Sequence, residues 1–173
     1  MDVYPTLVDL LGLPLPTADS FPLEGLSLRP LLEKPSLRML PGRDFALSTY
    51  ARCPRVGEEV PLPNGPRTVW NTECIHDTER SSFPYMGYTM RVDNYRYTEF
   101  VRWNGSSLSP IWGEVLSREL YNHTLDVPGT PEWEERDDFE DINRVLSAPQ
   151  ELVSQLAEKL RAAFGAGGRP VLK

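Results

Sequence analysis

The sequence predicts an α+β fold, in which a C-terminal helix packs on a small antiparallel sheet of about four strands with long irregular loops. Alternating β-rich runs over residues 85–103 predict the centre of the sheet, and apolar residues at helical spacing over 147–165 predict the helix. The 17 prolines among 173 residues predict the loops, because proline interrupts helices and central strands. We expect residues 1–43 to form an N-terminal helix with a proline-rich connecting segment, and residues 44–173 to form the main domain.

The first predicted element is a short amphipathic helix over residues 2–12. Pro5 fits its first turn, and Gly12 fits the left-handed cap at its C-terminus. So short a helix is marginal by itself, so its apolar stripe must dock on a partner, inside or outside this chain. The stripe consists of Val3, Leu7, Leu10 and Leu11.

The next stretch alternates short regular segments with loops. Prolines between residues 15 and 42 leave room for one helical turn near residues 30–32, and residues 44–50 predict a strand. Residues 52–83, rich in proline, glycine and charge, predict a long loop that is either functional or poorly ordered. Beyond the hairpin, we expect a short helix or strand at 111–116 and an edge strand at 118–122.

The hairpin over residues 85–103 is the most clearly specified element. Its two runs flank Asp93-Asn94, residue types that tolerate the positive φ angles of a tight turn. In the first run Tyr88 alternates with polar neighbours such as Thr89, and in the second Tyr97 alternates with Thr98. Because neither run is purely apolar on one side, we expect aromatic cross-strand pairs on both faces rather than one apolar face and one solvated face.

The last predicted element is the C-terminal helix. Ser147 and Gln150 fit a capping box with Pro149 in the first turn, and Gly165 fits the C-terminal end. We expect the apolar face of the helix to pack across the sheet that the hairpin builds. That face consists of Leu152, Val153, Leu156, Leu160 and Phe164.

Charge and hydropathy narrow the possible partners. The net charge of -7 disfavours nucleic acid and anionic membranes, since both attract basic surfaces. No segment approaches the ~20 apolar residues of a membrane span. Asp2 and Asp9 interrupt the Leu-rich start, so we expect no signal peptide, and the chain by itself does not indicate a compartment.

Few residues suggest chemistry on their own. Cys53 and Cys74 fit either one disulfide or two free thiols, and not a zinc site. His76 and His123 fall in different elements without a nearby nucleophile or ligand cluster, so neither a catalytic triad nor a metal centre is expected. The acidic run at 132–138 lacks EF-hand spacing and predicts a solvated segment rather than a calcium site.

Two tripeptides fit the acceptor pattern for N-glycosylation. They begin at Asn104, in Asn-Gly-Ser, and at Asn122, in Asn-His-Thr. Such a pattern matters only in a chain that enters the secretory pathway.

Four stretches, in order, resemble the C-terminal part of the sulfatase family, and specifically its iduronate-2-sulfatase branch. They are Asp-Val-Tyr-Pro-Thr-Leu with Leu-Leu-Gly-Leu-Pro within 2–14, Gly-Leu-Ser-Leu-Arg-Pro-Leu-Leu at 25–32, Met-Gly-Tyr-Thr-Met-Arg with Tyr-Arg-Tyr-Thr within 86–98, and Glu-Leu-Tyr-Asn-His at 119–123, with Asp126 and Asn143 after it. The resemblance covers nearly the whole chain. It departs from the family where an Asp-Pro is expected, because Val127 separates Asp126 from Pro128.

The resemblance implies the smaller, C-terminal subdomain of an enzyme that hydrolyses sulfate esters of glycosaminoglycan-type sugars. In whole enzymes the catalytic formylglycine, the calcium ligands and the sulfate-binding Lys and His lie upstream, and those motifs do not occur here. The chain is thus expected to hold no catalytic residue, metal or cofactor, to be inactive alone, and to need a sulfatase catalytic subdomain as partner. It is expected to be a fragment, a truncated gene model or a separately encoded half. A lysosomal, secreted or periplasmic location is also implied.

What this subdomain would add is part of the rim of the substrate pocket. Arginine suits a sulfate or carboxylate, and tryptophan suits a sugar face. The candidate rim residues lie in and just before the long loop, and are Tyr50, Arg52, Arg55, Trp70 and His76. Two alternatives remain: a non-catalytic binding module with the same fold, and a maturable nucleophile at Cys53. The Cys-Pro-Arg there lacks both spacer residues of the sulfatase Cys-x-Pro-x-Arg signature, so we expect no chemistry from it.

Overall fold

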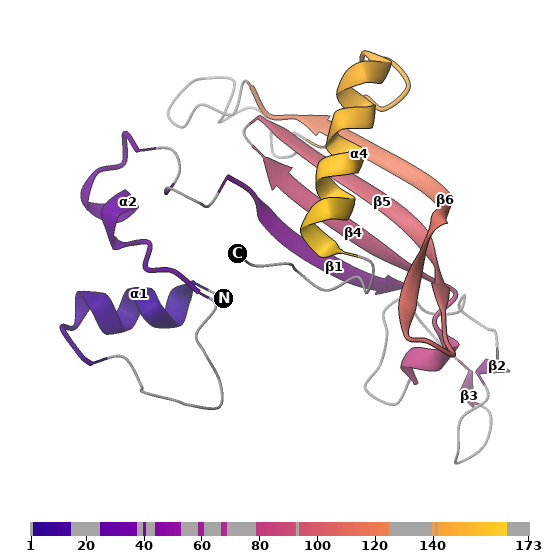
Figure 1. Ribbon diagram of the computed structural model, residues 1–173, viewed down its shortest axis with the longest axis horizontal. Coiled ribbons are helices and arrows are strands. Elements are labelled where there is room, and N and C mark those ends of the chain that lie inside the picture. The colour runs from indigo at the N-terminus through magenta and orange to yellow at the C-terminus, as the bar shows by residue number, and fades with distance from the viewer. Residues whose placement is uncertain are drawn as a thin grey trace. The chain divides into compact units, whose positions relative to one another are not determined.

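The computed structural model describes residues 2–14, 25–37, 40, 44–52, 59–60, 67–68, 79–92, 94–124, 140 and 142–165. The chain divides into two compact units, one ending at Asp44 and one beginning at Phe45 (Figure 1). Among the helices in these ranges, none is long and apolar enough to cross a membrane.

The larger unit is built on a four-stranded antiparallel sheet with the strand order β1-β4-β5-β6 (Figure 1). Its strands are β1 (Ala46–Arg52), β4 (Tyr85–Val92), β5 (Tyr95–Asn104) and β6 (Ser109–Asn122). The predicted long loop also contains a short antiparallel pair, β2 (Glu59–Val60) with β3 (Arg67–Thr68), and the 3-10 turn η1 (Arg80–Ser82). With its C-terminal helix α4 (Gln150–Phe164), the unit has the predicted α+β fold.

The central hairpin forms where the sequence predicted it. Val92 pairs with Tyr95, so a two-residue turn joins β4 to β5. The prediction that the two faces of the hairpin would be alike was wrong. Aromatic residues do occur on both faces, as predicted, but the face under α4 is mostly apolar, with Glu99 as its buried charge, whereas the other carries polar residues such as Thr89 and Thr98. The reason is that the helix covers only one side of the sheet.

Strand β6 is a single strand of 14 residues, where the sequence predicted two shorter segments. Its pairing with β5 shifts register between Phe100 and Trp103, and such a bulge lets a strand bend without ending. Its outer edge is partly paired by Asn143, whose Oδ1 accepts from Leu120 N at 3.0 Å and whose Nδ2 donates to Arg118 O at 3.0 Å. This carboxamide satisfies backbone groups that an edge strand otherwise leaves exposed.

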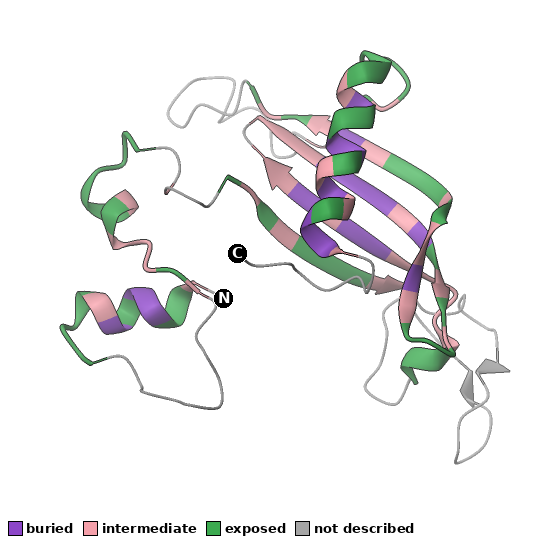
Figure 2. Cartoon of the chain, viewed as in Figure 1, coloured by how far each residue is buried: buried purple, intermediate pink, exposed green. Residues whose placement is uncertain are grey.

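Helix α4 lies across one face of the sheet, as predicted (Figures 1 and 2). It ends at Gly165, whose φ of 63° is the left-handed conformation expected for glycine. The predicted capping box was wrong, because the Ser147 hydroxyl donates to Arg144 O at 3.2 Å in the preceding turn and Pro149 occupies the N-cap position. The buried face consists of Val153, Leu156, Ala157, Leu160, Ala163 and Phe164.

The core between α4 and the sheet is centred on aromatic rings. The Tyr88 ring centroid lies 4.8 Å from that of Trp112 and 4.9 Å from that of Phe164. Trp112 Nε1 donates to Gly165 O at 3.1 Å, which ties β6 to the end of the helix. Figure 2 shows buried segments both on α4 and on the central strands beneath it.

One buried carboxylate also joins helix and sheet. Glu99 of β5 is 0% exposed and accepts from Tyr97 Oη at 3.0 Å. Arg118 Nε of β6 donates to Glu99 Oε1 at 3.0 Å, and Arg161 of α4 donates from Nε to Oε2 at 2.9 Å and from Nη2 to Oε1 at 3.0 Å. We call these four residues the Glu99 network. It compensates a charge that would otherwise be costly to bury.

Alkaline pH should destabilise the larger unit. Burial raises the pKa of Tyr88 from 10.0 to about 12, and burial with the adjacent Glu99 carboxylate raises that of Tyr97. The folded state therefore binds these protons more tightly than the unfolded state. The stability they contribute is complete below pH ~10 and is lost as pH rises toward ~12.

Tyr88→Phe tests this dependence, because phenylalanine keeps the ring and removes the titrating hydroxyl. Between pH 9 and 11 the unsubstituted protein should lose about 1.4 kcal/mol more free energy of unfolding than the variant. Urea unfolding at pH 9, 10 and 11 measures this difference. Parallel pH profiles for the two proteins would contradict the assignment to Tyr88.

The smaller unit pairs helix α1 (Val3–Leu10) with helix α2 (Arg29–Glu33), close to the predicted helix and helical turn. Thr6 Oγ1 accepts from Leu28 N at 2.8 Å, and the Asp9 carboxylate accepts from Ser27 Oγ at 2.6 Å and Arg29 Nη1 at 3.2 Å. The two hydrogen bonds to the Asp9 carboxylate lower its pKa, and the one from Ser27 has the larger effect. The α1 residues buried here are Pro5, Thr6 and Val8.

The predicted apolar stripe of α1 does not take part in the contact between α1 and α2. Its residues and their neighbours expose between 49% and 67% of their surface: Val3, Tyr4, Leu7, Leu10, Leu11 and Leu13. No described residue of the smaller unit covers them. We call this set the α1 apolar face.

Candidate functional site

The candidate site lies on the face of the sheet opposite α4. Strand register places its side chains in two neighbouring rows that cross the strands. An aromatic row consists of Tyr50, Gly87 and Phe100. A hydroxyl row consists of Ser48, Thr89 and Thr98 and ends at Glu119.

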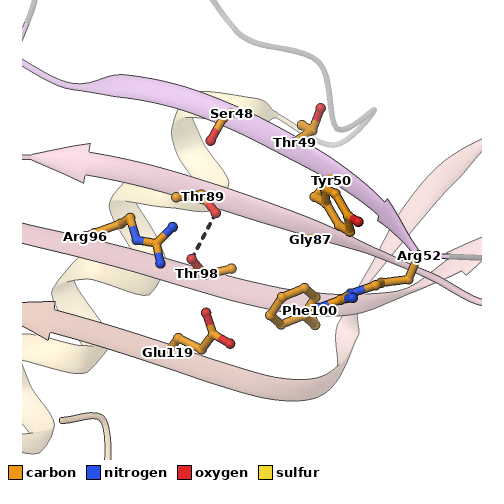
Figure 3. A pocket seen from close by; sticks show the side chains of 10 residues that line it. All are labelled: Ser48, Thr49, Tyr50, Arg52, Gly87, Thr89, Arg96, Thr98, Phe100 and Glu119. Carbon is orange, nitrogen blue, oxygen red and sulfur yellow. Dashed lines mark hydrogen bonds between the residues drawn. The ribbon is translucent and has the colours of Figure 1, made fainter. Parts of the chain in front are cut away.

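These rows line an open pocket of about 480 Å³ (Figure 3). Its walls mix guanidinium, hydroxyl, carboxylate and aromatic groups, in contrast with the apolar face beneath α4. The lining residues are Ser48, Thr49, Tyr50, Arg52, Gly87, Thr89, Arg96, Thr98, Phe100 and Glu119.

Arg52 is held over the aromatic row. Its Cζ lies 5.0 Å from the ring centroid of Tyr50 and 5.4 Å from that of Phe100. Both distances are within the range of cation–π attraction, which fixes a guanidinium without neutralising it. Among the described residues, Arg52 has no carboxylate partner. The pocket thus holds a positioned cation that no carboxylate of the described residues compensates.

Gly87 makes room for this arrangement. A Cβ atom there would lie 2.8 Å from Phe100 Cε1 and 3.5 Å from Tyr50 O. The absence of a side chain therefore lets the Phe100 ring lie across the middle strand, next to the rim of the pocket. This close approach explains why glycine stands in the interior of a paired strand, where it otherwise weakens the sheet.

The hydroxyl row forms the floor. Thr89 and Thr98 hydroxyls are 2.9 Å apart and share a hydrogen bond, as Figure 3 shows, and Thr98 is only 3% exposed. At the end of the row, the Glu119 carboxylate has no hydrogen-bond or ion-pair partner in the described ranges. Hydroxyl and carboxylate oxygens of this kind accept hydrogen bonds from a ligand's hydroxyl groups.

Arg96, the second arginine that lines the pocket, already has a carboxylate partner. Arg96 Nη2 forms an ion pair with Glu140, and its Cζ lies 5.0 Å from the ring centroid of Tyr121. Glu140 Oε1 is also 3.3 Å from Nε2 of His123, a side chain that is 9% exposed. His123 thus lies beside Glu140 in a packed polar cluster.

The structure places two of the five predicted rim residues, Tyr50 and Arg52, side by side at the pocket. The other three lie outside the described residues, as do both cysteines: Arg55, Trp70, His76, Cys53 and Cys74. Sequence reasoning missed the contributions of β4, β5 and β6, for which the only signal was the alternation that puts Thr89 and Thr98 on one face of the hairpin.

The two glycosylation candidates are exposed at strand ends, Asn104 as the last residue of β5 and Asn122 as the last residue of β6. Asn104 Oδ1 accepts from the backbone N–H of Ser106 at 3.0 Å, and Asn122 Oδ1 accepts from that of Thr124 at 2.9 Å. Among the described residues there is no group of three or more His, Cys, Asp or Glu side chains able to hold a metal ion.

The pocket presents a positioned guanidinium, hydroxyl groups and a carboxylate, all of which can form hydrogen bonds to a ligand. The fold and the pocket together define an α+β domain with a polar pocket on the uncovered face of its sheet. No protein-family model and no curated protein matches the chain.

Proposed function

We propose that this chain is the C-terminal subdomain of an iduronate-2-sulfatase-like sulfuric ester hydrolase acting on sulfated glycosaminoglycan-type sugars. The observation that carries the proposal is the four-stranded antiparallel sheet with a C-terminal helix on one face. This is the arrangement that the sequence resemblance implies for the smaller sulfatase subdomain.

In this proposal the chain supplies structural support and part of the substrate rim. Tyr50 and Arg52 support the second role, because they meet at one pocket, and the Arg52 guanidinium, which no described carboxylate pairs with, suits sulfate or carboxylate. The catalytic formylglycine and calcium belong to a sulfatase catalytic subdomain, joined upstream or encoded separately. No residue of this chain is assigned a catalytic role.

The α1 apolar face supports the need for a partner. Contiguous apolar surface of this kind marks a contact site rather than an ordinary solvent-facing surface. Leu7 and Leu10 expose 52% and 49% of their surface. We assign this face to the contact with the catalytic subdomain.

A non-catalytic binding module with the same fold is the second candidate function. The pocket itself favours it, because a preformed cation and hydroxyl row bind a ligand without any catalytic group. The two candidates differ in whether a catalytic subdomain restores turnover.

Sulfate release from a 2-sulfated iduronide is the deciding measurement. We expect none from this chain alone with calcium, and turnover above that of the catalytic subdomain alone when the two are combined. Turnover by the chain alone would refute the incomplete-subdomain proposal, and a combination no more active than the catalytic subdomain alone would favour the binding module.

The double substitution Leu7→Asp with Leu10→Asp tests the assigned contact. Burying two carboxylates in an apolar contact is costly, so the gain in turnover on mixing should be lost. Leu146→Asp is the matched control, because Leu146 is 97% exposed in the other unit and should leave the gain unchanged. Equal loss in both variants would contradict the assignment.

A further inference from the structure

We propose that Asn104 is a site of spontaneous deamidation, in which the backbone amide of Gly105 displaces ammonia from the Asn104 carboxamide. The site lies where β5 ends and the turn to β6 begins. The products are an aspartyl or an isoaspartyl residue in place of asparagine. The inference is independent of the sulfatase proposal and of the pocket, because the reaction needs only this turn and water.

The carboxamide of Asn104 is held where it can react. Asn104 is exposed, and its Oδ1 accepts from Ser106 N at 3.0 Å and from Ser107 N at 3.1 Å. The hydrogen bond from Ser106 closes a ring that contains both Cγ of Asn104 and the amide nitrogen of Gly105, so these two atoms are kept close together. Both donors also stabilise the negative charge that develops on Oδ1 when a nucleophile adds to Cγ.

The nucleophile is the amide nitrogen of Gly105. None of the described residues accepts a hydrogen bond from this N–H. Glycine has no side chain to hinder the approach of its nitrogen to Cγ of Asn104. The fold also requires glycine here, because a Cβ atom at this position would lie 1.9 Å from Ser81 O. Tight packing of the turn on η1 therefore preserves the residue that leaves Asn104 least protected.

Two other asparagines of the larger unit lack a free amide after them. Asn122 is followed by His123, whose N–H donates to Asn94 O at 2.7 Å. Asn143 is followed by Arg144, whose N–H donates to a β6 carbonyl oxygen at 2.8 Å. Each of these amides must leave its hydrogen bond before it can attack, which requires local opening of the structure. The fold thus favours reaction at Asn104 over these two positions.

The reaction balances with water as its only co-reactant. The Gly105 nitrogen gives up its proton and bonds to Cγ of Asn104, and the Cγ–Nδ2 bond breaks as ammonia leaves with that proton. Water then opens the cyclic imide, at Cγ to give aspartate or at the backbone carbonyl carbon to give isoaspartate. Either product adds one negative charge at neutral pH. It also removes the Asn-Gly-Ser acceptor pattern, so deamidation and an attached glycan exclude each other.

The isoaspartyl product disturbs the turn more than the aspartyl product. It adds one backbone carbon between Asn104, which pairs with Ser109, and Gly105, which fits tightly against η1. Beside this contact, Trp103 Nε1 donates to Arg80 O at 2.8 Å. The longer backbone cannot keep both the strand pair and the tight contact, so we expect η1 to loosen from the end of β5.

The test is incubation of the full, unglycosylated chain at neutral pH, both folded and in guanidinium, followed by tryptic peptide mapping. Each asparagine falls in a different tryptic peptide, and Asn104 is read from residues 103–118. The second Asn-Gly pair, at Asn64, lies outside the described residues and is read separately from residues 56–67.

In the folded chain, deamidation at Asn104 should be faster than at Asn122 and Asn143. The ratio of these rates should also be at least about tenfold larger in the folded chain than in guanidinium, because only the fold withholds the amides that follow Asn122 and Asn143. An equal or smaller ratio in the folded chain would overturn the inference, since the selectivity would then come from the local sequence alone.

Asn104→Gln is the matched variant, because glutamine keeps a carboxamide but must form a larger ring to react. On incubation the unsubstituted chain should lose melting temperature, and its isoaspartyl fraction, separated by chromatography, should melt below Asn104→Asp. Asn104→Gln should keep the melting temperature of its own fresh sample. An equal loss in Asn104→Gln would contradict the assignment of the change to Asn104. Failure of these measurements is distinct from failure of the turnover experiment, which does not depend on this turn.

Discussion

Phe164→Ala is expected to lower the free energy of unfolding of the larger unit by about 3–5 kcal/mol. Phe164 is 1% exposed, and its ring contacts that of Tyr88 edge to face at 4.9 Å. Truncation removes apolar burial and this ring contact, and leaves a cavity between the helix end and the sheet. Guanidinium unfolding followed by tryptophan fluorescence measures the loss.

Leu146→Ala is the control for Phe164→Ala, because Leu146 lies just before α4 and is 97% exposed. Its free energy of unfolding should stay within about 0.5 kcal/mol of the unsubstituted value. If both variants lost similar stability, α4 would not pack through Phe164 as described.

Arg161→Met is expected to cost about 2–3 kcal/mol of unfolding free energy by disrupting the Glu99 network. The substitution keeps the apolar stem of the side chain but leaves the fully buried Glu99 carboxylate with Arg118 as its one cation among the described residues. The cost lies in the partly compensated Glu99 carboxylate rather than in the lost guanidinium, because the Arg161 side chain itself is 36% exposed. Urea unfolding at neutral pH measures it.

A second substitution separates the cost of the buried Glu99 charge from the cost of losing the Arg161 side chain's own contacts. Adding Glu99→Leu to Arg161→Met removes the buried charge, so the double variant should regain at least about 1 kcal/mol over Arg161→Met alone. Arg102→Met is the surface control, since the Arg102–Glu114 pair is 53% and 54% exposed and should contribute less than about 1 kcal/mol. A double variant less stable than Arg161→Met would show that the network stabilises the fold by its charges.

The larger unit shows how far local pattern predicts structure. The hairpin, the apolar face of α4 and the glycine ends of α1 and α4 were predicted because each depends on spacing within a few residues. Strand β6 was predicted in two segments, because its continuity depends on a bulge opposite β5 that has no local signal. The capping box was predicted wrongly, because the Ser147 hydroxyl is used by the preceding turn.

For the candidate site, the sequence by itself determined the residue types and the alternation that put Thr89 and Thr98 on one face of the hairpin. Only the tertiary structure decided which face α4 covers, and therefore which face is left to form a pocket. It also decided that Arg52 lies over Tyr50 and Phe100 while Arg96 is paired with Glu140. The physical reason is that strand register and helix placement bring together residues from separate strands, and local propensity does not encode such long-range contacts.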